Sequence, residues 1–166
     1  MTIVRHHNDP SFWQFQLDTA QTTQDRELEA VALTNLGASY EAALQHHRAI
    51  DKYQQAILIF RELGDLNREI WALNNLGTTY YRLGLYNRAE GVYLQALTAA
   101  RTAGALAREG WVLRSLGHTY RSMGRYDEAV AAVKEAVAVF QERGTATELA
   151  EAIELLKDVR HECNME

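Results

Sequence analysis

The stretch NNLGTTY at residues 74–80 decides the fold, because variants of it occur at a fixed spacing along the chain. The sequence reads TNLGASY at 34–40 and RSLGHTY at 114–120, so the period is 40 residues and no gap is needed. A fixed period of this length is the signature of a repeat architecture. Eight columns are identical in all three copies: Glu29/Glu69/Glu109, Leu33/Leu73/Leu113, Leu36/Leu76/Leu116, Gly37/Gly77/Gly117, Tyr40/Tyr80/Tyr120, Ala49/Ala89/Ala129, Ala56/Ala96/Ala136 and Gly64/Gly104/Gly144.

The same register continues beyond the three full copies. Residues 12–21 align with residues 92–101 at two periods, and Ile153 and Leu156 fall on the columns of Leu113 and Leu116. The sequence therefore predicts one array with a half repeat at 10–25, full repeats at 26–65, 66–105 and 106–145, and a closing helix at 146–161. We expect residues 1–9 and 162–166 to be flexible, as free termini usually are.

Each repeat is predicted to be a pair of helices, because its apolar residues recur at steps of three and four. Glycines such as Gly84 and Gly104 follow the apolar stripes, where a helix commonly ends in a left-handed residue. Asp25 and Asp65 precede the next stripes as N-caps. The expected helices span about 10–22, 26–43, 46–63, 66–83, 86–103, 106–123, 126–143 and 146–161. No strand pattern competes with them.

Composition narrows the class of protein further. The 166 residues carry a net charge of −5, which argues against a dedicated nucleic-acid binder. The single cysteine excludes an internal disulfide framework and any site built from several cysteines. No apolar run reaches the length of a membrane helix. The first residues contain no secretory signal pattern, so we expect a cytoplasmic protein without membrane insertion.

The repeat motif resembles the tetratricopeptide repeat. In the second copy the motif consists of Leu73, Leu76, Gly77 and Tyr80, followed in the next helix by Ala89, Tyr93 and Ala96. The usual period is about 34 residues, and the longer period here is similar to that of kinesin light chains and of many bacterial regulatory arrays. The resemblance implies an all-α, right-handed superhelix of antiparallel helix pairs that acts as a non-enzymatic scaffold for peptides and proteins.

The family resemblance also implies that the first helix of each pair lines the inner groove. At about 100° per residue, the arc opposite the buried leucines forms the candidate peptide-binding surface. Within this arc, Arg82, Arg114 and Arg121 outnumber Glu41, which predicts a basic groove on an acidic body. The candidate groove residues are Thr34, Asn35, Trp71, Asn74, Asn75, Thr78, Tyr81, Arg82, Trp111, Arg114, Ser115, His118 and Arg121.

The residue types in this arc indicate an extended, acidic or carboxylate-bearing peptide as the ligand. The amides of Asn35 and Asn75 share a column and can both donate to and accept from a peptide backbone. Arginine offers a two-pronged donor for carboxylates. Trp71 and Trp111 could serve as apolar anchors or could pack on neighbouring helices, and the sequence leaves this choice open.

No catalytic or metal-binding pattern is found in the sequence. The pairs His6–His7 and His46–His47 are adjacent in sequence, and adjacent residues on a helix diverge too far to chelate one ion. Cys163 lies near the end of the chain without a predicted basic partner that would activate it. We therefore expect no enzyme activity, no metal and no cofactor.

Two functions remain open at this stage. The leading interpretation is an adaptor that holds a segment of an unidentified partner protein in the groove. The alternative is a structural scaffold that self-associates through its terminal helices. Phe12, Trp13 and Phe15 make the first helix more apolar than a capping helix should be, so a homodimer through this helix is the form we expect any self-association to take.

Overall fold

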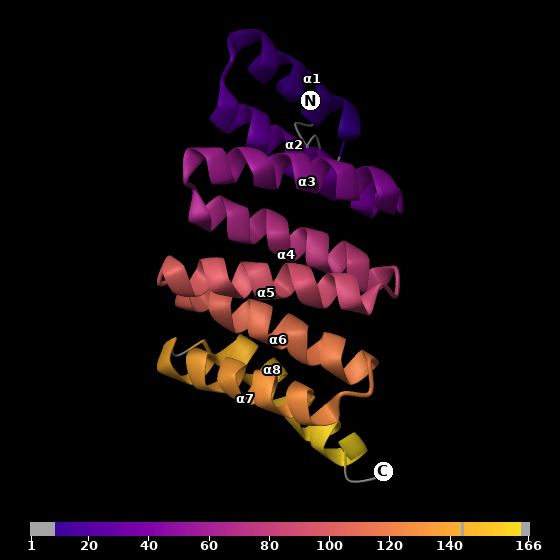
Figure 1. Cartoon of the computed structure of the whole chain (residues 1–166), viewed down its shortest axis with the longest axis vertical. Coiled ribbons are helices and arrows are strands. Elements are labelled where there is room, and N and C mark those ends of the chain that lie inside the picture. The colour runs from indigo at the N-terminus through magenta and orange to yellow at the C-terminus, as the bar shows by residue number, and fades with distance from the viewer. Residues whose placement is uncertain (1–8, 144, 164–166) are drawn as a thin grey trace, which may run out of the picture.

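The computed structural model describes residues 9–143 and 145–163, and within these ranges the chain is an all-α array of eight helices (Figure 1). Every observed helix end lies within two residues of the end expected from the periodicity, and the described residues include no strand. The helices are α1 (Pro10–Thr23), α2 (Arg26–Ala42), α3 (His46–Leu63), α4 (Leu66–Arg82), α5 (Tyr86–Thr102), α6 (Leu106–Ser122), α7 (Tyr126–Arg143) and α8 (Ala146–Cys163).

Local sequence signals set the ends of these helices. The side chains of Asp25 and Asp65 accept hydrogen bonds of 2.9 Å from the backbone N–H groups of Leu28 and Arg68, which confirms both residues as N-caps. Gly84 follows α4 with a φ of +71°, where a side chain would be strained. The matching residue in the first repeat is Leu44, which adopts the same left-handed conformation with a φ of +58°.

In the first and second repeats the two helices cross where a glycine faces an aromatic ring, and in the third repeat Gly117 faces Val133. From sequence, the small residues Gly77 and Ala89 on consecutive helices predict a crossing in which these two residues face each other and the backbones approach. The ring of Tyr93 occupies this place instead, and a Cβ atom on Gly77 would lie 2.5 Å from its Cε1 atom. Gly37 and Tyr53 repeat the arrangement at 2.7 Å. The glycine column is therefore needed to admit a buried side chain of the next helix, which is a tyrosine ring in the first two repeats and Val133 in the third.

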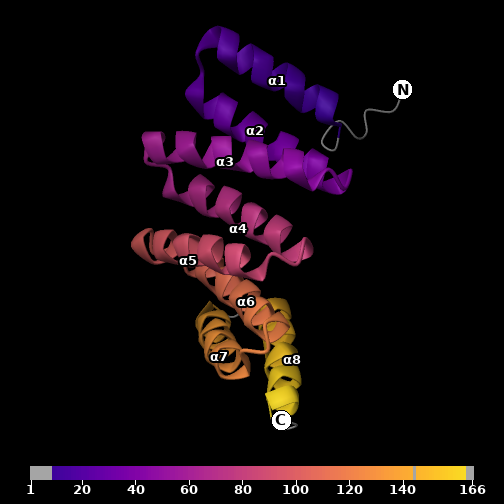
Figure 2. The ribbon, with the colours of Figure 1, turned by 45° about the vertical axis from the view of Figure 1, so that its right-hand side comes forward.

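The array curves around one row of helices. Cα atoms of α2 and α4, of α4 and α6, and of α6 and α8 approach within 8 Å, whereas the outer helices α3 and α5 do not approach each other to this distance within the described ranges. The row formed by α2, α4, α6 and α8 is therefore the inner side of the superhelix. Figure 2 shows the helices stacked in chain order from α1 to α8. A continuous apolar core follows the stack from Leu17 to Val159.

Charged side chains repeat with the same period and tie successive helices together. Arg61 bonds Glu69 at 2.6 Å and the amide of Gln95 at 2.9 Å. One period later, Arg101 bonds Glu109 at 2.8 Å and Glu135 at 2.7 Å. Glu69 and Glu109 lie in the first turns of α4 and α6, where a carboxylate complements the helix dipole. The glutamate column therefore also fixes each of these inner helices to the outer helix before it.

The closing helix extends two residues beyond the expected end. Glu162, in its last turn, accepts a hydrogen bond of 2.8 Å from Nε of Arg121 on α6. This contact holds Glu162 against the array, although Glu162 was expected to belong to a flexible tail. Asp9 is likewise the N-cap of α1. The rest of the two expected flexible ends, residues 1–8 and 164–166, lies outside the described residues.

Candidate functional site

All of the predicted groove residues lie on helices of the inner row, but one of them is buried in the core. Thr34 is fully buried, and its hydroxyl donates to the carbonyl oxygen of Ala30 at 2.9 Å. Its prediction as a groove residue is therefore corrected, because the side chain points into the core on that side of α2. Arg82, Trp111 and His118 are exposed. The others are half-buried: Asn35, Trp71, Asn74, Asn75, Thr78, Tyr81, Arg114, Ser115 and Arg121.

Trp71 and Trp111 line one common cavity between α4 and α6. Neither is buried in the core, and Trp111 keeps 42% of its surface exposed. The cavity, which we call the tryptophan pocket, has a volume of about 210 Å³. Its lining residues are Ile70, Trp71, Asn74, Asn75, Arg108, Trp111 and Val112. Arg108 was not among the predicted groove residues.

The asparagine column does not present two equivalent amides. The side-chain nitrogen of Asn35 donates to the carbonyl oxygen of Val31 at 2.9 Å, so its own helix uses this donor. Asn75 lines the tryptophan pocket instead. The neighbouring Asn74 holds a buried Oδ1 atom that has no hydrogen-bond partner among the described residues. Buried acceptors are normally satisfied, so this oxygen lacks a donor that the described residues do not supply.

The predicted cations of the groove are paired with carboxylates. Arg82 reaches Glu41 at 3.1 Å, Arg114 pairs with Glu151, and Arg121 pairs with Glu162. In each pair the carboxylate belongs to an adjacent inner helix. The charge count from sequence omitted the closing helix, whose residues Glu151, Glu154, Asp158 and Glu162 extend the inner row. The inner side is therefore not the basic surface that was expected.

A second inner cavity of about 470 Å³ lies between α6 and α8. It brings together four of the predicted residues, namely Arg114, Ser115, His118 and Arg121, with the carboxylates of the closing helix. Loss of hydration lowers the pKa of His118 below its ordinary value of 6.5, and the positive charges of Arg114 and Arg121 lower it further. The lowered pKa favours the neutral form of this histidine, which can accept a hydrogen bond.

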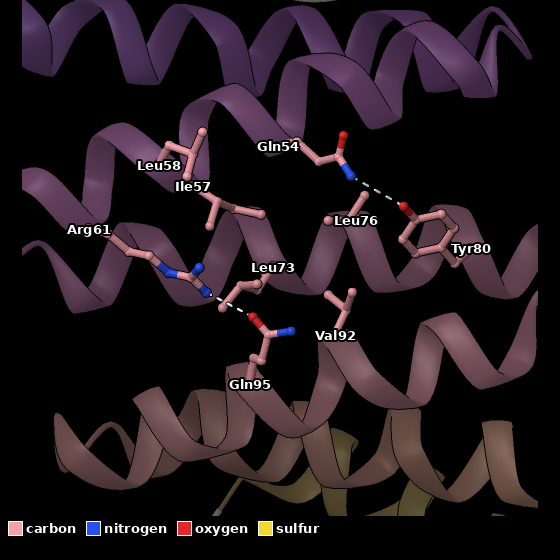
Figure 3. Close-up of a pocket in the computed structure, with 9 residues that line it drawn as sticks. All are labelled: Gln54, Ile57, Leu58, Arg61, Leu73, Leu76, Tyr80, Val92 and Gln95. Atoms are coloured by element: carbon pink, nitrogen blue, oxygen red, sulfur yellow. Dashed lines mark hydrogen bonds between the residues drawn. The ribbon is translucent and has the colours of Figure 1, made fainter.

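An outer cleft, which the sequence did not predict, lies between α3 and α5 over α4 (Figure 3). Its volume is about 400 Å³, and apolar side chains of Ile57, Leu73 and Val92 line it. The amide of Gln54 and the hydroxyl of Tyr80 approach to 3.4 Å at one end, and Arg61 bonds Gln95 at the other. The cleft exists because the outer helices diverge while the inner ones touch.

The described residues offer no group for metal chemistry. No three His, Cys, Asp or Glu side chains in ranges 9–143 and 145–163 are placed to hold a metal ion. Over the same part of the chain, none of the helices has both the length and the hydropathy that crossing a bilayer requires. The arrangement is that of a binding surface built from amides, rings and paired charges.

These features define the class of the protein, which is an α-helical repeat array. Two sequence profiles described as tetratricopeptide repeat match the chain, one over residues 28–102 and the other over residues 111–143. The chain belongs to the tetratricopeptide repeat family, whose fold is generally a non-enzymatic scaffold for protein–protein interaction. The expectation drawn from the LxxLGxxY motif is thus confirmed.

Solved structures share this fold at low sequence identity. The apo form of RapI superposes with a TM-score of 0.87 at 16% identity, over 93% of this chain and 43% of that one. Aspartyl phosphate phosphatase F from Bacillus subtilis gives 0.83 at 22% identity, over 93% and 41%. BtubC from P. vanneervenii gives 0.71 at 22% identity, over 93% and 72%. The chain thus spans less than half the length of the first and second of these, and a search of curated sequences found no significant match.

Proposed function

We propose that the chain is a cytoplasmic, non-enzymatic adaptor that binds an extended segment of a partner protein along its inner helices. The observation that carries this proposal is the tryptophan pocket, which joins two consecutive repeats on the inner side. Two indole rings, the amide of Asn75 and the unpartnered oxygen of Asn74 meet there. Aromatic anchors beside free polar groups are typical of sites that bind peptides.

Two further observations support the proposal. Peptide backbones offer N–H and C=O groups at regular intervals, and an asparagine amide can match either of them. Another Rap protein with this fold was solved in complex with competence and sporulation factor, at a TM-score of 0.68 and 17% identity, over 92% of this chain and 48% of that one. That complex concerns the other protein, but it shows that an array with this fold can hold a further molecule.

The groove arginines do not by themselves favour an acidic segment of the partner protein. Arg82, Arg114 and Arg121 already have carboxylate partners in the free chain. An acidic peptide at these positions would have to displace glutamates of the protein. Such exchanges yield little net free energy, because partly exposed ion pairs are worth only about 0–1 kcal/mol each.

The test is a selection of short random peptides on the full chain, followed by affinity measurements with labelled peptides. Asn75→Ala and Trp111→Ala should each weaken binding by roughly tenfold, because each removes a central contact. Asn87→Ala, an exposed asparagine on α5, is the matched control and should leave affinity unchanged. If the selected peptides bind both groove variants as well as the parent, the inner surface is not the binding site.

Self-association through α1 is the second candidate function. In the described part of the chain α1 packs only against α2, and Phe15 exposes 66% of its surface. An apolar ring at the end of an open array is a contact site for a second copy. Light scattering of the parent and of Phe15→Asp over a range of concentrations tests this role.

A further inference from the structure

Arg108 differs from Arg82, Arg114 and Arg121 on the inner row, because it has no carboxylate partner among the described residues. Within the described ranges it forms no ion pair, whereas Arg82, Arg114 and Arg121 each form one. Its side chain is half-buried and lines the tryptophan pocket. A cation that has no counter-charge and lies at the edge of an apolar pocket can donate hydrogen bonds to an anionic ligand.

The repeat itself shows why this arginine is unpaired. One period earlier the same column holds Arg68, which pairs with Glu27 at 2.6 Å and with Asp65 at 2.9 Å. The residues in the corresponding columns of the next repeat are Asn67 and Ala105, and neither carries a charge. The third repeat therefore keeps the arginine and lacks both carboxylates that neutralise it in the second.

The other walls of the pocket complete a set of complementary groups. Ile70 and Val112 are 1% exposed and form an apolar base, while Trp71 and Trp111 supply ring faces. Asn74 also lines the pocket, and its Oδ1 atom is buried without a donor among the described residues. An occupant that satisfies all of these groups has a carboxylate for Arg108, an N–H group for Asn74 and carbon atoms to cover the indoles.

We propose that the tryptophan pocket binds the side chain of a glutamate or aspartate in the middle of an extended partner segment. The carboxylate accepts from the guanidinium of Arg108, and a backbone N–H of the segment donates to Oδ1 of Asn74. An internal residue fits better than a chain end, because the inner surface continues on both sides of the pocket. It continues with Asn35 on α2 and with the cavity between α6 and α8. This inference rests on the proposed function and assigns the acidic preference to Arg108.

The experiment uses peptides selected on the full chain and compares the parent with Arg108→Gln. The selected peptides should share an acidic residue, and its replacement by the matching amide should weaken binding to the parent by roughly tenfold or more. The same replacement should change little on Arg108→Gln, since the two groups then no longer interact. Arg143→Gln, which removes an exposed cation of α7, is the matched control and should bind as the parent does.

The outcomes separate this inference from the function on which it rests. Peptides that need Asn75 and Trp111 but bind Arg108→Gln like the parent would overturn the inference and leave the proposed function standing. Loss of binding on amidation of the peptide carboxyl terminus, with no effect of the side-chain replacement, would also overturn it. Binding that ignores Asn75→Ala and Trp111→Ala would reject the proposed function itself. Thermal melting of Arg108→Gln checks that the variant is folded.

Discussion

The ring of Tyr93 lies so close to the backbone of Gly77 that a methyl group on this glycine would come within 2.5 Å of it. The ring is itself held in place, because its hydroxyl lies 3.1 Å from that of Thr78. Burial of the ring raises the pKa of Tyr93, so the phenol stays protonated and can donate this bond. The contact joins α4 and α5 at the centre of the second repeat.

Gly77→Ala should therefore destabilise the protein by about 1–3 kcal/mol through overpacking. The matched control is Gly91→Ala on α5, where an added methyl group meets nothing within 4 Å. This control should stabilise the protein by about 0.5–1 kcal/mol, because alanine loses less backbone entropy in a helix than glycine. Urea denaturation of both variants measures the difference. Equal stability of the two would contradict the described crossing.

Leu44→Gly should raise the stability of the chain. Leu44 adopts a left-handed conformation with a φ of +58° and is 75% exposed, so it has backbone strain without burial in return. Relief of this strain is worth up to about 1 kcal/mol, which corresponds to a rise in Tm of about 2–4 °C in a chain of this size. Gly84→Ala makes the reverse change at the matching turn and should lower Tm. A Leu44→Gly variant that melts below the parent would refute this account of the turn.

The lowered pKa of His118 predicts an acid-sensitive contribution to stability. The unfolded histidine titrates near 6.5 and the folded one below it, so between these pH values the unfolded chain binds more protons. The contribution is present above about pH 6.5 and is lost as the pH falls through the folded-state pKa. Denaturation series of the parent and of His118→Gln should therefore diverge on acidification in this window.

A nuclear magnetic resonance titration of His118 checks the cause directly. Its midpoint should lie below 6.5 in the parent and should rise in Arg114→Gln, because one of the two repelling cations is then removed. A midpoint at or above 6.5 in the parent would show that neither lost hydration nor charge controls this histidine.

Phe15→Asp should abolish self-association if the chain forms a dimer through α1. The ring is 66% exposed, and a charge at this position makes an apolar contact between two copies unfavourable. Light scattering over a range of concentrations should give a rising mass for the parent and a constant monomer mass for the variant. Leu58→Asp changes a leucine of similar exposure on α3 and is the control. A parent that stays monomeric at every concentration would reject the structural role, and dimerisation that persists in a chain lacking residues 1–22 would move the interface away from α1.

The sequence predicts the fold well because the determinants of each repeat are local. Leu73, Leu76 and Gly77 lie within five residues, and their recurrence at a fixed period specifies both the helix pair and its stacking. The partner of the glycine was misjudged for a physical reason. Helix direction and period do not specify whether Ala89 or the ring of Tyr93 fills the crossing, since this depends on the rotation of α5 about its axis.

The charges of the inner surface could not be predicted from one helix at a time. Arg121 pairs with Glu162, which lies 41 residues further along the chain on the next inner helix, and an arc drawn on a single helix does not include it. Arg108 lay outside that arc and was therefore missed. A comparison of columns would have found it, because the residues corresponding to Glu27 and Asp65 in the next repeat are both uncharged.

The contrast between touching inner helices and diverging outer ones has a mechanical consequence. The contacts of α4 with α2 and with α6 act as a pivot, so a change in curvature is taken up on the outer side, where the cleft between α3 and α5 is open. A bend about this pivot that narrows the cleft flattens the array and widens its concave inner surface. A molecule wedged into the cleft increases the curvature and narrows that surface. Occupancy of the outer face is thereby coupled to the width of the inner surface, so the two faces of the array cannot respond independently.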